Sequence, residues 1–174
     1  PDDGTVLEIG CGTGRNLIQA ARIFPAARYF GFDVAPVMVE TAQRSVARAG
    51  LDQQVTLAQG DATNFDAALI FGQPSFDRIF ISYSLSMIPD WQRVLERAAD
   101  HLAPGGALLI ADFGTSEGLP RAFSAVLFKW LAFFSVHPRT GLEREMRRIA
   151  AARGFKCDFE PLYGGYAVWG MLRR

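Results

Sequence analysis

The chain has 174 residues, of which 49% are hydrophobic, and it carries 18 basic and 18 acidic side chains. This size is typical of one domain with a full apolar core, and a net charge of zero argues against a dedicated nucleic-acid-binding protein. The two cysteines, Cys11 and Cys157, are far apart and belong to no CxxC or His-rich cluster, so we expect no metal site, no disulfide framework and a cytoplasmic location.

Apolar runs that end in glycine or aspartate alternate with helix-spaced segments along the chain. Strands are predicted at 5–9, 28–33, 55–58, 76–82, 107–113, 155–160 and 166–172. Helices are predicted at 16–24, 36–49, 90–102 (capped by Asp90), 119–135 and 140–153, and a turn at 104–106. This alternation predicts a doubly wound α/β fold with a mostly parallel sheet. Ligands of such sheets bind beyond the carboxyl ends of the strands, where we expect the chemistry.

The most informative stretch is residues 6–14, VLEIGCGTG, in which a strand leads into three glycines. Gly10, Gly12 and Gly14 allow a sharp bend and a close approach to a ligand, and the following helix directs free amides to the same place. A dinucleotide-binding loop has the pattern G-x-G-x-x-G. Here the third glycine comes one position early, and Glu8 would repel a pyrophosphate. The same carboxylate suits a cationic ligand.

The E-x-G-x-G-x-G pattern resembles motif I of the seven-stranded S-adenosylmethionine-dependent methyltransferases. The resemblance implies a Rossmann-like fold over residues 1–174, strand order 3-2-1-4-5-7-6 with the seventh strand antiparallel, S-adenosylmethionine as cofactor, and no metal. It places Glu8 near the methionine moiety of the cofactor and Gly10, Cys11, Gly12 and Gly14 along the cofactor cleft. The family has a helix before the first strand. We expect that helix to be missing here, because the first strand begins four residues after Pro1.

Further residues fall where the family places cofactor contacts. Asp33 ends the second predicted strand, where a carboxylate can accept both ribose hydroxyls. Within residues 60–62, Gly60-Asp61-Ala62, the acidic residue would take the adenine amino group. Val34 and Met38 are candidates for the apolar walls, although Met38 fits a core position equally well. Ser82, which ends the fourth predicted strand, completes the candidate cofactor set.

The segment after the fourth strand, residues 81–91, is where acceptors usually meet the methyl group in this family. It lacks the Asn/Asp-Pro-Pro-aromatic signature of methyltransferases that act on nucleic-acid bases or glutamine. Tyr83 is the candidate to offer a hydroxyl or a π face to a cationic amine product, and packing of the cleft wall is its alternative role. Alignment can supply most of the acceleration of a sulfonium methyl transfer, so the sequence needs no catalytic base.

Several segments are similar to the bacterial betaine-lipid N-methyltransferases, which trimethylate the amine of diacylglyceryl-homoserine: residues 83–91, 112–114, 118–121, 136–139 and 161–167. The similarity implies a lipid headgroup amine as acceptor and places His137 or Arg139 near the headgroup carboxylate. It also makes Tyr163 and Tyr166 candidate substrate contacts. The alternatives are a turn histidine, a surface arginine and ordinary strand aromatics.

Charge and apolar patterning leave the partner open. Residues 1–112 carry 8 basic and 13 acidic side chains, whereas residues 113–174 carry 10 basic and 5 acidic ones. The basic side chains are either solvated or face an anionic partner such as the inner membrane surface. The aromatic-rich helix predicted at 119–135 either packs on the sheet or lies at a membrane interface. Two other functions stay open: a methyltransferase for a soluble small molecule or quinone precursor, and a non-catalytic cofactor-binding domain.

Overall fold

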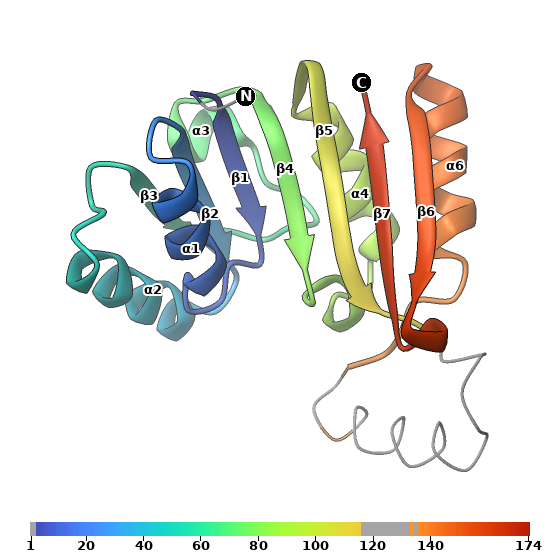
Figure 1. Cartoon of the computed structure of the whole chain (residues 1–174), viewed down its shortest axis with the longest axis horizontal. Coiled ribbons are helices and arrows are strands. Elements are labelled where there is room, and N and C mark those ends of the chain that lie inside the picture. The colour runs from blue at the N-terminus through green and yellow to red at the C-terminus, as the bar shows by residue number, and fades with distance from the viewer. Residues whose placement is uncertain (1–2, 116–132, 134–135) are drawn as a thin grey trace.

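The computed structural model describes residues 3–115, 133 and 136–174 (Figure 1). The helix predicted at 119–135 therefore lies outside the described residues, apart from Phe133. None of the described helices has the length and apolar character needed to cross a membrane.

One seven-stranded sheet runs through the molecule in the order β3-β2-β1-β4-β5-β7-β6 (Figure 1). The strand β7 is antiparallel to both of its neighbours, and the other neighbouring pairs are parallel. This confirms the α/β fold class and the strand order that the resemblance implied. The strands are β1 (Thr5–Ile9), β2 (Arg28–Asp33), β3 (Val55–Gln59), β4 (Phe76–Ser82), β5 (Leu102–Phe113), β6 (Lys156–Leu162) and β7 (Ala167–Arg173).

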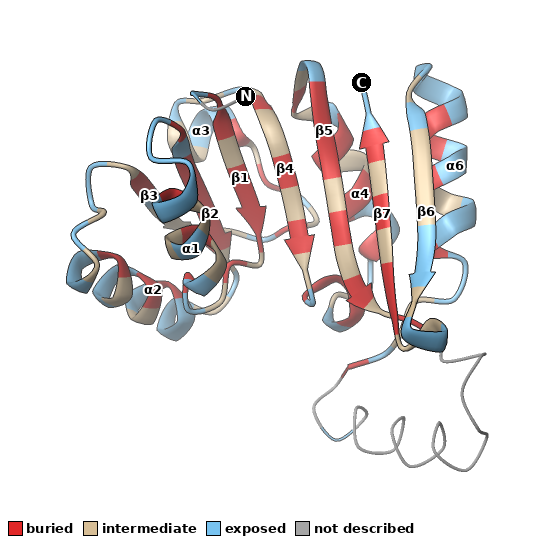
Figure 2. Cartoon of the chain, viewed as in Figure 1, coloured by how far each residue is buried: buried red, intermediate tan, exposed pale blue. Residues whose placement is uncertain are grey.

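Two apolar clusters cover opposite faces of the sheet, because successive strand side chains point to opposite sides. Leu7 and Phe30 belong to the larger cluster, whereas the neighbouring Tyr29 belongs to the smaller one. The smaller cluster packs under α1 (Arg15–Ile23) and α2 (Pro36–Arg48), and the larger under α3 (Ala67–Phe71), α4 (Trp91–Asp100) and α6 (Leu142–Arg153). Figure 2 shows buried residues along the strands β1, β2, β4 and β5 in the middle of the sheet, whereas β6 at its edge has none.

The short elements were not predicted. They are α3 and two single-turn 3₁₀ helices, η1 (Leu85–Met87) and η2 (Tyr163–Gly165). In α3, the Asp66 carboxylate caps the helix by accepting from the amides of Ala68 and Leu69. A helix of five residues has too few positions for its periodicity to be recognised.

The turn predicted at residues 104–106 is wrong. Residues 104–106 are not a turn before a strand that starts at 107. They lie inside β5 at a register shift, which lets the strand continue past Gly105 with its positive φ of 75°. Asp90 is the N-cap residue of α4, as predicted, although its side chain makes no capping hydrogen bond. Asp90 also lines a cavity.

Gly31 in β2 tests how tightly α1 packs on the sheet. A Cβ there would lie 2.5 Å from Leu17 Cδ1 and 3.0 Å from Cys11 Cβ, which cannot move without the glycine loop. We predict that Gly31→Ala lowers the free energy of unfolding by about 1–3 kcal/mol in urea titrations. Gly170→Ala is the comparison, because there the added Cβ meets the flexible end of Met146 at 2.7 Å and the edge of the Phe159 ring at 3.3 Å, and no atom fixed to the backbone of a loop. Equal losses in both variants would contradict this reading.

Candidate functional site

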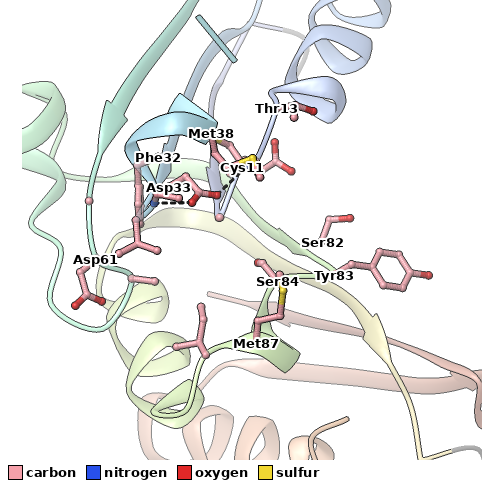
Figure 3. Close-up of a pocket in the computed structure, with 18 of the residues that line it drawn as sticks. Cys11, Thr13, Phe32, Asp33, Met38, Asp61, Ser82, Tyr83, Ser84 and Met87 are labelled. Atoms are coloured by element: carbon pink, nitrogen blue, oxygen red, sulfur yellow. Dashed lines mark hydrogen bonds between the residues drawn. The ribbon is translucent and has the colours of Figure 1, made fainter. Parts of the chain in front are cut away.

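A cavity of about 840 Å³ opens beyond the carboxyl ends of β1, β2, β3 and β4 (Figure 3). Four loops line it, and each follows one of these strands. Because the strands are parallel, their carboxyl ends lie at one edge of the sheet and bring the loops together. The cavity lies where the fold class predicts a ligand site.

The three glycines after β1 have different roles. All have positive φ, of 72°, 52° and 76° at Gly10, Gly12 and Gly14. A Cβ on Gly10 would lie 2.7 Å from Ser84, whereas a Cβ on Gly12 would meet nothing within 4 Å. Gly12 therefore presents its bare backbone to the cavity, and Gly10 lets the loop after β4 approach. Gly14 does not line the cavity, since it begins α1 and packs against Ala42.

Glu8 is a buried carboxyl group with one unused oxygen. The side chain is 1% exposed, and its Oε1 accepts a hydrogen bond of 2.8 Å from Asn16 Nδ2. Oε2 has no hydrogen-bond partner among the described residues. Burial raises the pKa of Glu8 to about 8, and the nearby Asp33 carboxylate adds to the shift. A buried acid of this kind is stabilised in its ionised form by a cation placed against Oε2.

Asp33 connects two of the loops. Its Oδ2 accepts from the Gly12 amide at 2.9 Å, and its Oδ1 accepts from the Ala35 amide at 3.0 Å (Figure 3). Each carboxylate oxygen can accept a second hydrogen bond, so capacity for ligand hydroxyls remains.

Asp61 and two apolar residues complete this end of the cavity. Asp61 Oδ1 accepts hydrogen bonds from the amide and the hydroxyl of Thr63, both at 2.8 Å. The hydrogen bond from the Thr63 amide is the largest cause that lowers the pKa of Asp61. Val34 is 66% exposed and Met38 is 42% exposed, and both line the cavity. Met38 therefore belongs to the cavity wall and not to the core.

Tyr83 lies at the other end, on the loop after β4, and points away from Asp33 and Asp61 (Figure 3). Its φ of 52° puts a non-glycine residue in the left-handed region, at a cost of about 1–2 kcal/mol. The ring packs edge-on against Phe113 with centroids 4.9 Å apart. Ser82 lies beside it on the cavity wall.

His137 and Arg139 do not line the cavity but hold one of its walls. Arg139 donates to the carbonyl oxygens of Leu85 at 3.2 Å and Ile88 at 2.7 Å, and the His137 amide donates to the Ser86 carbonyl at 2.9 Å. These bonds fix the backbone of η1, whose loop lines the cavity. Direct contact of His137 or Arg139 with a substrate carboxylate stays a prediction.

Tyr163 and Tyr166 also lie outside the cavity lining. Tyr163 is 81% exposed in η2, and Tyr166 packs edge-on against Phe113 with centroids 5.9 Å apart. Tyr166 is thereby connected to Tyr83 through Phe113.

The remaining candidate cofactor residues, Cys11, Gly60 and Ala62, line the cavity. Sequence reasoning missed Asn16, although a polar side chain in the first turn after the glycine loop was a usable signal. Other lining residues were also missed, namely Thr13, Arg15, Phe32, Ala35, Thr63, Ser84, Met87, Ile88, Pro89 and Asp90. Among the described residues, no group of three or more His, Cys, Asp or Glu side chains is arranged to hold a metal ion.

Comparison with known sequences gives a family match. Residues 6–106 match a family model described as a methyltransferase domain. The ribosomal RNA small subunit methyltransferase C of Pseudomonas aeruginosa (strain LESB58) is 37% identical over 107 residues, which are 60% of this chain and 31% of that protein. The trans-aconitate 2-methyltransferase of Deinococcus radiodurans is 35% identical over 107 residues, 60% of this chain and 36% of that protein. The chain thus spans about a third of the length of these curated relatives.

Solved structures agree on the fold. An S-adenosylmethionine-dependent methyltransferase from Mesorhizobium loti has a TM-score of 0.75 at 19% identity, covering 100% of this chain and 93% of that one. The Haemonchus contortus phosphoethanolamine N-methyltransferase 2, in complex with S-adenosyl-L-methionine, has a TM-score of 0.72 at 28% identity, covering 91% of this chain and 34% of that one.

Removing the Arg139 side chain tests its role in holding the cavity wall. We predict that Arg139→Ala lowers the free energy of unfolding by about 1 kcal/mol, because two hydrogen bonds from a partly buried charged donor are lost. Amide hydrogen exchange at residues 85–88 should become faster. Arg147→Ala removes only an exposed ion pair with Glu143 and should leave both measurements unchanged. Unchanged exchange in Arg139→Ala would show that the wall does not need this residue.

Proposed function

The chain belongs to the family of S-adenosylmethionine-dependent methyltransferase domains, and we propose that its cavity binds S-adenosylmethionine and transfers the methyl group to an amine. The charge of the cavity lining carries this proposal. Its four carboxyl groups, Glu8, Asp33, Asp61 and Asp90, outnumber the guanidinium of Arg15. Such a lining favours ligands with positive charge, which the sulfonium cofactor and the ammonium formed by methyl transfer to an amine both carry.

The residues present fit the cofactor. Glu8 has a buried oxygen with no partner in the described chain, which suits the ammonium of the methionine moiety. Asp33 keeps free acceptor capacity for the ribose hydroxyls, and Asp61 would take the adenine amino group. We assign the remaining contacts to the backbone and side chains of Gly10, Cys11, Gly12, Val34, Met38, Gly60, Ala62 and Ser82, with Gly14 acting indirectly as the start of α1.

Bound in this way, S-adenosylmethionine supplies an activated methyl group that an amine lone pair can displace from sulfur. The chain's own contribution is alignment and exclusion of water. Tyr83 lies at the end of the cavity away from Asp61, next to Ser82 (Figure 3). We assign this Tyr83 end of the cavity to the acceptor. Tyr83 is the residue we assign to contact the acceptor nitrogen.

For the acceptor, we propose the homoserine amine of a diacylglyceryl-homoserine lipid, met at the anionic cytoplasmic face of the membrane. The similarity of residues 83–91 and 161–167 to betaine-lipid N-methyltransferases supports this choice. So do exposed apolar side chains on the cavity wall: Val34 is 66% and Met87 50% exposed. The Haemonchus neighbour is named for an amine acceptor. The curated relatives are named for RNA and trans-aconitate, so they do not select an acceptor class.

The first experiment measures methyl transfer from labelled S-adenosylmethionine to a panel of acceptors, with cofactor binding measured by calorimetry. The panel contains detergent-dispersed diacylglyceryl-homoserine, phosphatidylethanolamine, ethanolamine and trans-aconitate. We expect cofactor binding and label on the homoserine lipid. Label only on ethanolamine would favour a soluble amine acceptor, and label only on trans-aconitate would overturn the amine proposal. Binding without any transfer would favour a non-catalytic domain.

Glu8 makes cofactor binding depend on pH. The pKa of its buried carboxyl group is about 8 without ligand, whereas contact with a cationic ammonium requires the carboxylate. Binding below pH 8 therefore releases a proton, and affinity should rise from pH 6 to pH 8 and then level off. We predict that Glu8→Gln weakens binding by about tenfold or more at pH 8 and removes this dependence.

The pH dependence of the free energy of unfolding of the same variant tests the Glu8 pKa without any ligand. Because the folded chain holds a proton on Glu8 that the unfolded chain releases, this group makes the ligand-free protein less stable as pH rises from 4.5 to 8. Glu8→Gln should lose that part of the pH dependence. Glu40→Gln, at an exposed position of α2 outside the cavity, is the control. Wild-type pH profiles in Glu8→Gln would show that the carboxyl group is not the cation contact.

A further inference from the structure

Three aromatic rings from three parts of the chain are in contact beside the acceptor end of the cavity, and Tyr163 lies on the same turn as one of them. Tyr83 follows β4, Phe113 ends β5, and Tyr163 and Tyr166 flank the turn between β6 and β7. The ring centroids are 4.9 Å apart for Tyr83 and Phe113, and 5.9 Å apart for Phe113 and Tyr166. Burial raises the pKa of Tyr83, and electrostatic interactions with Tyr166, Asp112 and Tyr163 add smaller contributions. We call these four residues the aromatic subsite.

Backbone contacts hold the aromatic subsite together. The Tyr83 amide donates to the Ala111 carbonyl at 2.8 Å, and the Gly114 amide donates to the Tyr166 carbonyl at 2.9 Å. A Cβ on Gly114 would lie 2.3 Å from the Gly165 carbonyl oxygen, so glycine is required for η2 to reach the end of β5. The turn that carries two of the tyrosines is thus fixed directly against the strand that carries Phe113.

The aromatic subsite is not an ordinary piece of core. Tyr83 and Tyr163 both have a φ of 52°, and they are the two non-glycine residues with positive φ among the described residues. They are also 42% and 81% exposed. Two strained tyrosines that keep their rings partly exposed beside a cavity are not explained by burial of apolar surface, and strain of this kind concentrates at ligand sites.

Electrostatics around the aromatic subsite favour a cation. Ring faces carry negative quadrupole potential, and phenol oxygens add acceptors. The buried carboxyl group of Asp112 adds little to this preference, because burial raises its pKa and the Arg139 guanidinium interacts with it. The Asp112 Oδ2 accepts from the Ser86 amide and its Oδ1 from the Phe113 amide, so these two amides hold it in place. An anionic ligand would meet no compensating group in this set.

We propose that the aromatic subsite binds the acceptor as a substituted ammonium, the N-methylated species that successive transfers produce. This deepens the proposed function and rests on it. In each transfer the nitrogen lone pair forms the N–C bond, the C–S bond breaks with its electron pair left on sulfur, and the positive charge moves to nitrogen. Where that nitrogen carries a proton, water takes it before the next transfer.

The aromatic subsite suits the later steps in particular. A quaternary nitrogen has no N–H to donate, so carboxylates and carbonyls hold it only by charge, whereas ring faces also make contact with its methyl groups. The same rings would retain mono- and dimethylated intermediates between transfers. Multiple methylation of one acceptor follows from this retention.

The test is a binding comparison that needs no turnover. Choline and its neutral carbon isostere, 3,3-dimethyl-1-butanol, are titrated into the protein saturated with S-adenosylhomocysteine. We expect choline to bind about 3- to 30-fold more tightly than the isostere. Tyr83→Leu and Tyr166→Leu should bring the ratio toward one, while Tyr83→Phe should keep it. Phe24→Leu, at an exposed aromatic outside the cavity lining, is the matched control.

The outcomes separate the aromatic subsite from the proposed function. Equal binding of the two probes, no binding of choline, or a preference that survives in both leucine variants would overturn the aromatic subsite, even if wild-type protein methylates amines. A choline preference lost in the leucine variants, with no transfer to any amine, would support the aromatic subsite and overturn the function. Because wild type alone gives the ratio, a leucine variant that fails to fold does not remove the test.

Discussion

The site depends on the attachment of the glycine loop to the end of β2. The Phe32 carbonyl accepts from the amides of Gly10 and Cys11, both at 3.0 Å, and the Asp33 carboxylate accepts from the Gly12 amide. These bonds set the path that the left-handed glycines follow, and that path leaves Glu8 beneath the loop with one oxygen unused. The loop, β2 and Glu8 therefore act as one unit. A change in any of them moves the polar groups that a cofactor would meet.

Features that depend on residues close together in the sequence could be predicted, whereas contacts between residues far apart in the sequence could not. Residues 8–14 and Asp33 could be predicted because short-range chemistry defines them: glycine spacing, a carboxylate before the loop, and a strand end. The α/β fold class followed from the alternation of strands and helices, whereas the strand order, which the structure confirms, was implied only by the family resemblance. The position of Arg139 could not be predicted, because it donates to the backbone carbonyls of Leu85 and Ile88, which are more than 50 residues away. Every residue has such a carbonyl, so the sequence does not indicate which ones Arg139 contacts. The contact of Tyr166 with Phe113 is equally long-range.

The two ends of the cavity differ in how they are built. At the cofactor end, polar groups are fixed by the backbone of a parallel sheet and by local turns. At the acceptor end, the wall from Ser84 to Ile88 is held by Asp112 and by residues 137–139 across the chain. Substitutions there can alter the acceptor pocket without disturbing the glycine loop. This division is consistent with relatives that share the family and are named for chemically unrelated acceptors.

The positions of the acidic side chains in the cavity have a consequence for binding of the product S-adenosylhomocysteine. The assigned contacts of Glu8, Asp33 and Asp61 all go to the ammonium, ribose and adenine groups, which are identical in S-adenosylmethionine and S-adenosylhomocysteine. Contacts of this kind bind both molecules equally and so give no preference for the methylated form. In the proposed function, any preference for fresh over spent cofactor would therefore come from the sulfonium charge facing the acidic lining. Product release would then depend on the loss of a single positive charge, because every other assigned contact is the same before and after transfer.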